Sequence, residues 1–553
     1  MVDAAWIVLD TEFDGARFRA ACAAHGGQHL DRRLHYTALA PRPVDASQLP
    51  EQWRVQWPPH VRGLHRMVSR DGLVTLDLLV GDPAASLAQL SATVDEVHLA
   101  WVPSSMTVLA RLMKDGARLQ AVYLDDGQRV ALWKEGFAFD ESRLRAVFHA
   151  RQAPVAPVQA IDRRAIVIGA GMAGSAACER LAARGWQVTL VERHAQPAGE
   201  ASGNLAGIFM PLLSKDDNIP TRLVRAAYLH ALRYWDRLGG VGTGAGRVVE
   251  GARCGVLHLA RDAQHAQVQR QIAASGEYPP EFARWLEPDE ASRLFGAPAP
   301  DGAWWFADGG WARPSSACAA MLDACGDLLT RRFSSSALAL VRINDEWHVA
   351  DAQGAVIAVA PTVILAAGAG AVDFVQASGL PLYTVRGQVT HLAQASLPAR
   401  PYVVCRESYM TPPYQGVVCV GATYDMRDDD ASLRTSSQQD NIGKTADILG
   451  VPVFDAPLAG RTGFRCMAPD RMPLVGALPD PGVPRRCEQL RDVPRWPGLH
   501  GLLGYASRGL IWAPLAAELL ACQLEGEPLP LENQLVAAMD PGRFVLKERR
   551  RAQ

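Results

Sequence analysis

The sequence lacks a charge bias and lacks clustered cysteines. Its 56 Lys and Arg residues nearly balance 58 Asp and Glu residues, for a formal net charge of −2. No global basic field therefore attracts a polyanion, and a nucleic acid would have to be met by a local patch. The ten cysteines form no Cys-x-x-Cys pair or Cys/His cluster, which argues against a zinc or iron–sulfur site and favours a reducing cytoplasm. We expect no metal.

Membrane and targeting segments are also lacking. The first ten residues have no basic start of the kind that a signal peptide has. Residues 355–372 are uncharged over a membrane-spanning length, but Pro361, Gly368 and Gly370 interrupt them. We expect a buried strand and turn there, no membrane partner and a cytoplasmic protein.

The chain does contain a dinucleotide-binding pattern over residues 164–192. A β-branched run at 165–168 predicts a buried parallel strand. A G-x-G-x-x-G turn follows at 169–174, then a helical pattern of small and apolar residues, and a second strand at 187–191. A lone G-x-G-x-x-G is often only a tight turn, but here strand, glycines, helix and second strand occur in order. This order predicts a dinucleotide site.

Each residue type in this pattern suits one task. Gly169 permits the tight turn, Gly171 lets the backbone approach a pyrophosphate, and Gly174 lets helix and strand pack closely. The free N–H groups of the helix start then bind the pyrophosphate. Glu192, just past the second strand, is placed to accept hydrogen bonds from ribose hydroxyls.

Later stretches are compatible with such a site. Residues 199–218 are dense in small polar residues and suit a surface loop, but the apolar Phe-Met-Pro-Leu-Leu within them argues against full exposure. Residues 361–371 predict an apolar strand running into glycines. This strand fits either the closing strand of a nucleotide fold or a plain core strand. Residues 382–424 alternate strand and turn, which predicts an antiparallel sheet. Residues 500–524 predict a strand, a turn and a helix beginning near Arg508, whose first N–H groups would face an anion.

Several motifs together resemble a known family. They are GAGMAG, ASGNLAGIFMPLLSK, CGVLHLA, GGWARP, VRGQVTH, GFRCMAPDRMPLVG and ASRGLIWAPLAAELLA. Residues 163 to about 545 resemble the flavin domain of the MnmC family, bacterial enzymes that act on the tRNA wobble uridine. More broadly they are similar to glycine oxidase, D-amino-acid oxidase and sarcosine oxidase. The resemblance implies FAD, a tRNA partner, and oxidation of 5-carboxymethylaminomethyl(-2-thio)uridine to 5-aminomethyl uridine with release of glyoxylate and hydrogen peroxide.

The same resemblance implies an α/β fold. It combines a Rossmann-type FAD-binding domain with an antiparallel-sheet substrate domain, as in D-amino-acid oxidase, after a reduced α/β methyltransferase-like domain. The expected divisions are a degenerate methyltransferase-like domain at 1–150, a linker at 151–162, the FAD-dependent oxidoreductase domain at 163–545 and a basic tail at 546–553. Within the oxidoreductase domain, FAD-binding parts are expected at about 163–250, 310–375 and 460–525, and substrate-domain parts at about 250–310 and 380–460.

The matched motifs also imply site residues. Arg465 falls where the amine-oxidase relatives have their carboxylate-binding arginine, and Tyr409 falls at their active-site tyrosine, which helps hold the same carboxylate. Arg508 is expected close to the flavin. An isolated Arg or Tyr is more often part of a surface ion pair or of core packing, but the matched motifs favour the functional interpretation. The residues expected to bind FAD are Gly169, Gly171, Gly174, Glu192, Arg193, Ser202, Gly203, Asn204, Gly368, Ser507, Gly509 and Leu510.

The N-terminal domain resembles the methyltransferase half of the same family in a damaged form. Residues 65–83 fit it well, but residues 9–18, where a glycine-rich loop for S-adenosylmethionine is expected, contain only Gly15. The acidic residue expected after the second strand is replaced within 36–43, and a later Asp-Gly-Phe-Ala-Pro segment is shortened to residues 102–105. Each loss removes a cofactor contact, so binding of S-adenosylmethionine and methyl transfer are not expected. A retained role in tRNA binding or in supporting the oxidase stays open.

Two other functions also stay open on the sequence. A small-molecule amine or amino-acid oxidase, acting on glycine- or sarcosine-like substrates, would carry the same Arg465 and Tyr409. A non-catalytic tRNA-binding flavoprotein would bind RNA without any substrate reducing its flavin. Arg549, Arg550 and Arg551 in the basic tail can contact phosphates, although such tails are usually just solvated.

Overall fold

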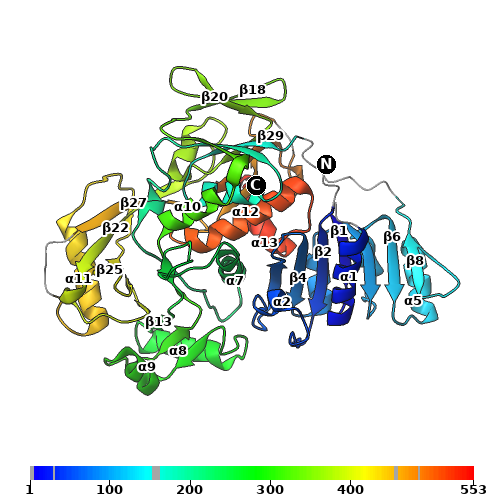
Figure 1. Ribbon diagram of the computed structural model, residues 1–553, viewed down its shortest axis with the longest axis horizontal. Helices are drawn as coiled ribbons and strands as arrows, with labels where there is room; N and C mark the ends of the chain where they lie inside the picture. The colour runs from blue at the N-terminus through cyan, green and yellow to red at the C-terminus, as the bar shows by residue number, and fades with distance from the viewer. Residues whose placement is uncertain (1–4, 29–31, 152–161, 454–458, 484–485, 553) are drawn as a thin grey trace. The chain divides into compact units, whose positions relative to one another are not determined.

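The computed structural model describes residues 5–28, 32–151, 162–453, 459–483 and 486–552 (Figure 1). The chain divides into two compact units. Unit 1 comprises Met1–Ile161 with Ala521–Val536, and unit 2 comprises Asp162–Leu520 with Ala537–Gln553. Most of the predicted linker, residues 152–161, lies outside the described residues. None of the described helices is long and apolar enough to cross a bilayer.

Unit 1 contains an eight-stranded sheet in the order β3-β4-β2-β1-β5-β6-β8-β7 (Figure 1, blue to cyan). The strands from β4 to β6 are parallel, and β3, β8 and β7 pair antiparallel with their neighbours. In chain order the elements are β1 (Trp6–Asp10), α1 (Gly15–Gln28), β2 (Leu34–Ala40), α2 (Glu51–Arg54), β3 (Gly63–Val68), β4 (Val74–Val80), α3 (Pro83–Gln89), β5 (Val94–Leu99), α4 (Met106–Ala110), β6 (Met113–Ala121), α5 (Asp126–Glu135), β7 (Phe137–Phe139) and β8 (Arg145–Phe148).

The central strands of this sheet are buried on both faces. Every residue of β2 is buried, and its side chains are divided between two hydrophobic clusters. Leu39 belongs to one cluster with Leu9 of β1, whereas Tyr36 and Ala38 belong to the other with Val8. Because both faces are covered, near-continuous apolar runs form parallel strands here, as expected for an α/β fold.

Unit 2 contains a six-stranded sheet in the order β17-β10-β9-β21-β29-β28, in which only β28 and β29 pair antiparallel. The predicted strand, helix and strand are confirmed as β9, α6 and β10. The uncharged run at 355–372 is not one strand and a turn: it forms two strands of different sheets, β20 and β21, and the 3-10 helix η3. The bounds are β9 (Arg164–Ile168), α6 (Met172–Ala182), β10 (Gln187–Val191), β17 (Leu329–Arg332), β20 (Val356–Ala360), β21 (Thr362–Leu365), η3 (Gly368–Asp373), β28 (Leu474–Pro479) and β29 (Arg495–Leu503).

A nine-stranded, mainly antiparallel sheet forms the rest of unit 2's framework. Its order is β14-β15-β13-β23-β24-β25-β22-β26, and β27 also pairs with β22. This confirms the antiparallel sheet predicted for residues 382–424. The bounds are β13 (Val256–Leu259), β14 (Arg284–Leu286), β15 (Ala303–Phe306), β22 (Tyr383–Ala393), β23 (Val403–Cys405), β24 (Tyr409–Met410), β25 (Val417–Gly421), β26 (Asp425–Met426) and β27 (Ala459–Met467).

Helices and two small sheets cover these two large sheets. The small sheets are β11-β16-β12 and β18-β19-β20. Their remaining strands are β11 (Gly207–Phe209), β12 (Gly251–Ala252), β16 (Gly310–Ala312), β18 (Ala339–Ile343) and β19 (Glu346–Ala350). Besides α6 and the C-terminal helix, the helices of eight or more described residues that follow β9 are α7 (Ile219–Arg237), α8 (Ala263–Ala274), α9 (Pro288–Phe295), α10 (Pro314–Asp323), α11 (Thr435–Leu449) and α12 (Gly509–Glu525).

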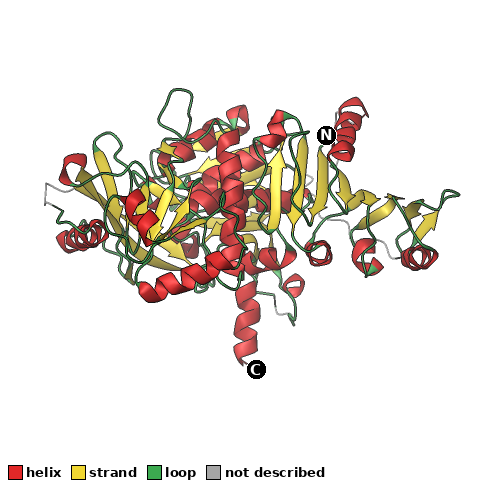
Figure 2. Ribbon diagram, turned by 90° about the horizontal axis from the view of Figure 1, so that it is seen from below, coloured by secondary structure: helices red, strands yellow, loops and turns green. Residues whose placement is uncertain are grey.

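The basic C-terminal segment is largely helical. Residues 543–552 form α14, which Figure 2 shows running out to the C-terminus. Arg543 donates two hydrogen bonds of 3.0 Å to the carboxylate of Asp470, and Lys547 donates a third at 3.1 Å. The side chains of Arg549, Arg550 and Arg551 lie outside the described part of the chain, so their contact with phosphates stays a prediction.

Candidate active site

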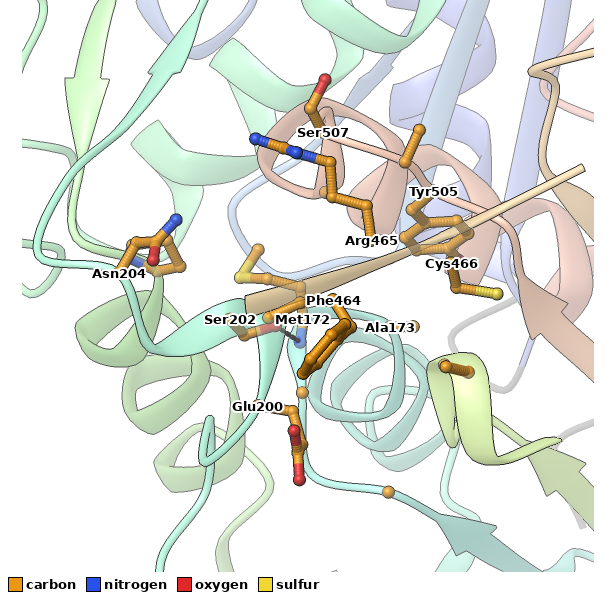
Figure 3. Close-up of a pocket in the computed structure, with 18 of the residues that line it drawn as sticks. Met172, Ala173, Glu200, Ser202, Asn204, Phe464, Arg465, Cys466, Tyr505 and Ser507 are labelled. Carbon is orange, nitrogen blue, oxygen red and sulfur yellow. Dashed lines mark hydrogen bonds between the residues drawn. The ribbon is translucent and has the colours of Figure 1, made fainter. Parts of the chain in front are cut away.

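A cavity of about 840 Å³ lies in unit 2, between the turn after β9, the loop after β10 and the nine-stranded sheet (Figure 3). A pocket of this size suits a cofactor or a small molecule. The site residues predicted from the sequence all line it, with the exception of Gly174, Gly203 and Arg508. Segments that are far apart in the sequence therefore meet around one space.

The glycine turn between β9 and α6 leaves no room for side chains at two positions. Gly169 adopts a φ of +105°, and a Cβ there would lie 2.7 Å from the carbonyl oxygen of Ala366. A Cβ on Gly174 would lie 1.8 Å from the carbonyl oxygen of Gly169. Gly174 therefore lets helix and strand pack closely, as predicted, without facing the cavity itself.

Gly171 faces the cavity at the start of α6. A Cβ on it would meet only Ser202, with the hydroxyl oxygen 3.1 Å away. As the N-cap residue, Gly171 has no side chain with which to satisfy the first N–H groups of the helix. The N–H of Met172 donates to Ser202 Oγ at 3.1 Å (Figure 3). This open helix start, with Ser202 beside it, forms a cradle for an anion.

Glu192 is buried at the end of β10 and lines the cavity. Its Oε2 accepts a hydrogen bond from the Ala170 N–H at 2.7 Å, and its Oε1 accepts one from the His194 N–H at 2.9 Å. The carboxylate thus holds the glycine turn in place. Each carboxylate oxygen can accept a second hydrogen bond, so the ribose contact stays a prediction. Arg193, next along the chain, lines the cavity and pairs with Glu200.

Arg461 ties the loop after β10 to the nine-stranded sheet. It lies on β27, 262 residues after Gly199, and donates hydrogen bonds of 2.7 Å to the carbonyl oxygens of Gly199 and Glu200. A Cβ on Gly203 would lie 2.2 Å from Arg461 Nη2, so Gly203 faces this guanidinium rather than the cavity. Sequence reasoning misses Arg461, because only the folded chain brings β27 to this loop.

Arg465 lies within the cavity wall, also on β27. Its Nη1 donates to the carbonyl oxygen of Thr423 at 3.1 Å, and its guanidinium carbon lies 5.7 Å from the centre of the Tyr424 ring. Burial lowers the pKa of Arg465, against the opposing effect of Tyr409, Tyr424 and Asp425. No carboxylate among the described residues forms an ion pair with it. A partly buried cation without a carboxylate partner is suited to an anionic ligand.

Tyr409 and Arg508, the two other predicted catalytic residues, differ in whether they line the cavity. Tyr409 of β24 lines the cavity, and burial raises the pKa of its hydroxyl. Arg508 does not line the cavity. Its backbone carbonyl accepts a hydrogen bond from the Trp512 N–H at the start of α12. Burial lowers the pKa of its guanidinium, against the opposing effect of Cys405. Cys405 and the two chain neighbours of Arg508, Ser507 and Gly509, do line the cavity. The proximity of Arg508 to a flavin stays a prediction.

Most residues that line the cavity were not predicted, and Phe464, Cys466 and Tyr505 are among them (Figure 3). Phe464 and Cys466 flank Arg465 in the sequence, so the motif GFRCMAPDRMPLVG could have predicted them as site residues. The Tyr505 hydroxyl is buried and has no hydrogen-bond partner in the part of the chain that the structure describes. Burial raises the pKa of this hydroxyl. An unsatisfied buried hydroxyl beside a cavity marks a position where a ligand group is expected.

In unit 1, hydrogen bonds bridge the sheet edge at which a nucleotide binds in folds of this kind. In an open parallel sheet a ligand binds beyond the strand ends where the strand order reverses, which here is between β1 and β5. Thr11, directly after β1, accepts the Ala100 N–H on its hydroxyl at 2.8 Å. The indole of Trp101 donates to the Thr11 carbonyl oxygen at 2.7 Å. These bonds join the ends of β1 and β5 where a ligand would enter.

Asp10, the last residue of β1, is also fully occupied. Arg17 donates to its two carboxylate oxygens at 3.0 and 3.1 Å, and the Tyr36 hydroxyl donates to Oδ2 at 2.7 Å. Burial and the neighbouring Asp10 carboxylate raise the pKa of Tyr36. The side chain of Arg17 is thus held against the carboxylate at the end of β1.

Comparison with known proteins adds a family match and two kinds of relative. Residues 164–523 match the family of FAD-dependent oxidoreductases named DAO. Two curated relatives bear the name tRNA 5-methylaminomethyl-2-thiouridine biosynthesis bifunctional protein MnmC. The protein of Azoarcus sp. (strain BH72) is 40% identical over 99% of this chain and 91% of the relative. The protein of Paraburkholderia xenovorans (strain LB400) is 39% identical over 94% of this chain and 84% of the relative.

Solved structures resemble unit 2. Iminodiacetate oxidase from Chelativorans sp. BNC1 has a TM-score of 0.54 and 25% identity, over 66% of this chain and 96% of that protein. Glycine oxidase from Geobacillus kaustophilus has a TM-score of 0.55 and 20% identity, over 69% of this chain and 99% of that protein. These similarities confirm the predicted D-amino-acid-oxidase-like fold class.

Proposed function

The chain belongs to the MnmC family and contains an FAD-dependent oxidoreductase domain at residues 164–523, and from this membership we propose its function. With molecular oxygen and water as co-reactants, it oxidises the carboxymethylaminomethyl group of the wobble uridine in tRNA, giving 5-aminomethyl uridine, glyoxylate and hydrogen peroxide. Because its substrate is tRNA, the protein works in the cytoplasm. The observation that carries the proposal is Arg465, a guanidinium in the cavity wall with no ion pair in the described chain.

The lining of the cavity fits FAD. The open start of α6 offers N–H groups to the pyrophosphate, and Gly171 leaves the space that a side chain would fill. The unpaired hydroxyl of Tyr505 offers a further hydrogen bond. Bound FAD supplies the acceptor for the electrons removed from the substrate. The protein's own task is to hold the substrate amine close to that acceptor and to keep water away.

Arg465 and Tyr409 hold the carboxylate of the substrate. A carboxymethylamine is a glycine with a large N-substituent, so it presents one carboxylate next to the carbon that is oxidised. A planar guanidinium can bind that carboxylate through two parallel hydrogen bonds. Tyr409, whose hydroxyl stays protonated because burial raises its pKa, donates a further hydrogen bond to the same group. Arg461 acts indirectly, by holding the loop that carries Ser202.

A second candidate is oxidation of a small amine. The observation that favours it is the likeness to iminodiacetate oxidase and glycine oxidase, whose names describe small carboxymethylamines or glycine itself. Anaerobic single-turnover bleaching of the flavin separates the two functions. We expect bleaching with carboxymethylaminomethyl tRNA at concentrations where iminodiacetate and glycine have little effect. Bleaching by the small amines but not by the tRNA would establish the second function. No bleaching by any substrate, with tRNA still bound, would indicate a non-catalytic tRNA-binding flavoprotein.

For unit 1 we propose that it binds no S-adenosylmethionine, although the relatives are named bifunctional. The contacts between Thr11, Ala100 and Trp101 and the pairing of Arg17 with Asp10 support this, because a ligand would have to break them to enter. Each lost hydrogen bond to a charged group costs on the order of 1.5–3 kcal/mol. Isothermal titration calorimetry of the whole protein tests it, and micromolar binding of S-adenosylmethionine would contradict the proposal.

A further inference from the structure

An aromatic ring at the rim of the cavity has no part in the proposed chemistry: Tyr424 is not among the residues that line the cavity, but it packs against Arg465, which does line it. Tyr424 lies between β25 and β26, and 46% of it is exposed. Its hydroxyl donates to the sulfur of Met467 at 2.9 Å, which orients the ring. The guanidinium carbon of Arg465 lies 5.7 Å from the ring centre. Tyr424 therefore contacts the proposed carboxylate-binding residue and is open to solvent at the same time.

A buried arginine holds the segment that follows Tyr424. Arg386, on β22, is completely buried and donates to the carbonyl oxygens of Asp430 and Ser432, each at 2.7 Å. It also donates to the carboxylate of Asp425 at 3.1 Å. These bonds hold the loop on both sides of its turn, and Tyr424 lies directly before the residue bound at Asp425.

The charges of this loop suit a neutral ligand rather than a phosphate. Asp428 and Asp430 pair with Arg434, and Asp425 pairs with Arg386, so these cations are already used. Asp429 lines the cavity and forms no ion pair among the described residues. Residues 425–434 contain four Asp and two Arg, including the exposed Arg427, so their net charge is −2; this charge repels a phosphate but not an uncharged aromatic group.

We propose that Tyr424 is the platform on which the uracil ring of the wobble nucleotide stacks while Arg465 holds its side-chain carboxylate. The inference rests on the proposed function and assigns the base-recognition element of the same site. Proteins that read single-stranded RNA stack splayed bases on aromatic side chains, because every base has a flat apolar face. A solvent-exposed, oriented tyrosine at the rim of a cavity provides such a face.

The distances agree with this arrangement. A stacked base lies roughly 3.5–4 Å from the tyrosine ring. The four bonds from the uracil ring to the carboxylate carbon span roughly 5 Å when extended. A charge-assisted hydrogen bond adds about 3 Å, for a total reach of roughly 8 Å. Because the guanidinium carbon of Arg465 lies over one face of the ring, 5.7 Å from its centre, the base stacks on the opposite face, displaced toward the ring edge, and its side chain passes that edge to reach Arg465. Stacking and carboxylate binding can therefore occur together.

The test compares two substrates that share the reacting group. One is an anticodon stem-loop RNA with 5-carboxymethylaminomethyl uridine at the wobble position, and the other is N-ethylglycine, which has no base. We expect Tyr424→Ala to lower kcat/KM for flavin bleaching by the stem-loop roughly 5- to 150-fold, mainly through KM, and to change the value for N-ethylglycine much less. Tyr424→Phe keeps the ring and should restore most of the loss. Met426→Ala, which removes an exposed side chain two residues away, is the matched control.

Salt dependence and flavin content complete the experiment. Stacking releases no counterions, so Tyr424→Ala should weaken stem-loop binding without changing the slope of log Kd against log salt. Equal losses for both substrates would show that Tyr424 only supports Arg465, and would overturn the inference. So would a Tyr424→Ala protein that retains full flavin and treats the stem-loop like wild type. If wild type itself fails to react with the stem-loop, the proposed function is wrong and the inference falls with it.

Discussion

Gly387 lies directly against the guanidinium of Arg465. A Cβ on Gly387 would lie 2.1 Å from Arg465 Nη1 and 2.4 Å from its Cζ. Gly387 belongs to β22 and pairs with Gly463 of β27, two residues before Arg465. The absence of a side chain at position 387 therefore creates the place in which the proposed carboxylate-binding group lies.

Gly387→Ala should displace Arg465 without disturbing the flavin. We expect kcat/KM for carboxymethylaminomethyl tRNA to fall roughly 10- to 100-fold, as small misplacements of binding groups do, at unchanged flavin content. Gly463→Ala is the control from the same strand pair, since its Cβ would meet only the Cα of Ala201 at 3.6 Å, an ordinary contact. Anaerobic bleaching kinetics measure both. Similar losses in the two variants would indicate strand distortion instead of a displaced guanidinium.

Replacing Arg465 itself should remove substrate binding more completely. Arg465→Ala should cost about 2–5 kcal/mol of transition-state stabilisation, because the substrate carboxylate would be left without its cation. Arg465→Lys should rescue only part of this, since an ammonium cannot bind both carboxylate oxygens in one plane. Both variants should purify with wild-type amounts of FAD. An Arg465→Ala enzyme that bleaches as fast as wild type would remove this residue from the site.

Gly171→Val should prevent flavin binding. The valine side chain would extend past Ser202 into the space above the start of α6, where the pyrophosphate is expected. Gly379→Ala is the control, because a Cβ there has no atom within 4 Å. The absorbance of flavin released on denaturation, per protein, measures the effect. Full flavin content in Gly171→Val would contradict the placement of the pyrophosphate.

The stability of unit 2 should depend on pH through His500. Burial lowers the pKa of this histidine, on β29, to about 4, whereas an unfolded histidine titrates near 6.5. The unfolded state therefore binds the proton more readily, so the contribution of His500 to stability is complete above about pH 6.5 and is lost as the pH falls toward 4. His500→Gln should reduce the loss of unfolding free energy between pH 7 and pH 5 by about 2 kcal/mol. Urea unfolding at the two pH values tests this, and an unchanged difference would refute it.

Removing Arg17 should destabilise unit 1. Arg17→Ala leaves the fully buried carboxylate of Asp10 with only Tyr36 as a side-chain partner, at an expected loss of roughly 1.5–3 kcal/mol. Arg42→Ala breaks the ion pair of Arg42 with Glu12, in which both side chains are exposed, and should change stability by less than about 1 kcal/mol. Chemical unfolding followed by tryptophan fluorescence measures both. Equal effects would show that the Asp10 network does not stabilise the strand end.

Local patterns sufficed for the nucleotide-binding part of the molecule. The β-branched run, the three glycines and the helix that follows are adjacent in sequence, so their spacing alone predicted β9, α6 and β10. The motif around Arg465 and the segment with Tyr409 were likewise found by resemblance, and both residues line the cavity. The roles of these two residues in binding a carboxylate remain predictions.

Local spacing predicted the βαβ unit, and the resemblance of the motifs predicted the fold class and the site residues that these motifs contain. Only the tertiary structure decided which distant residues meet: Arg461 with the loop at Gly199, Arg465 with Gly387, and Tyr424 at the rim. The contact between Arg465 and Gly387 follows from the antiparallel register of β22 and β27. A shift of one residue would turn every side chain of β27 to the opposite face. Packing on both faces of the sheet sets that register, and packing between distant segments leaves no periodic signal in the local sequence.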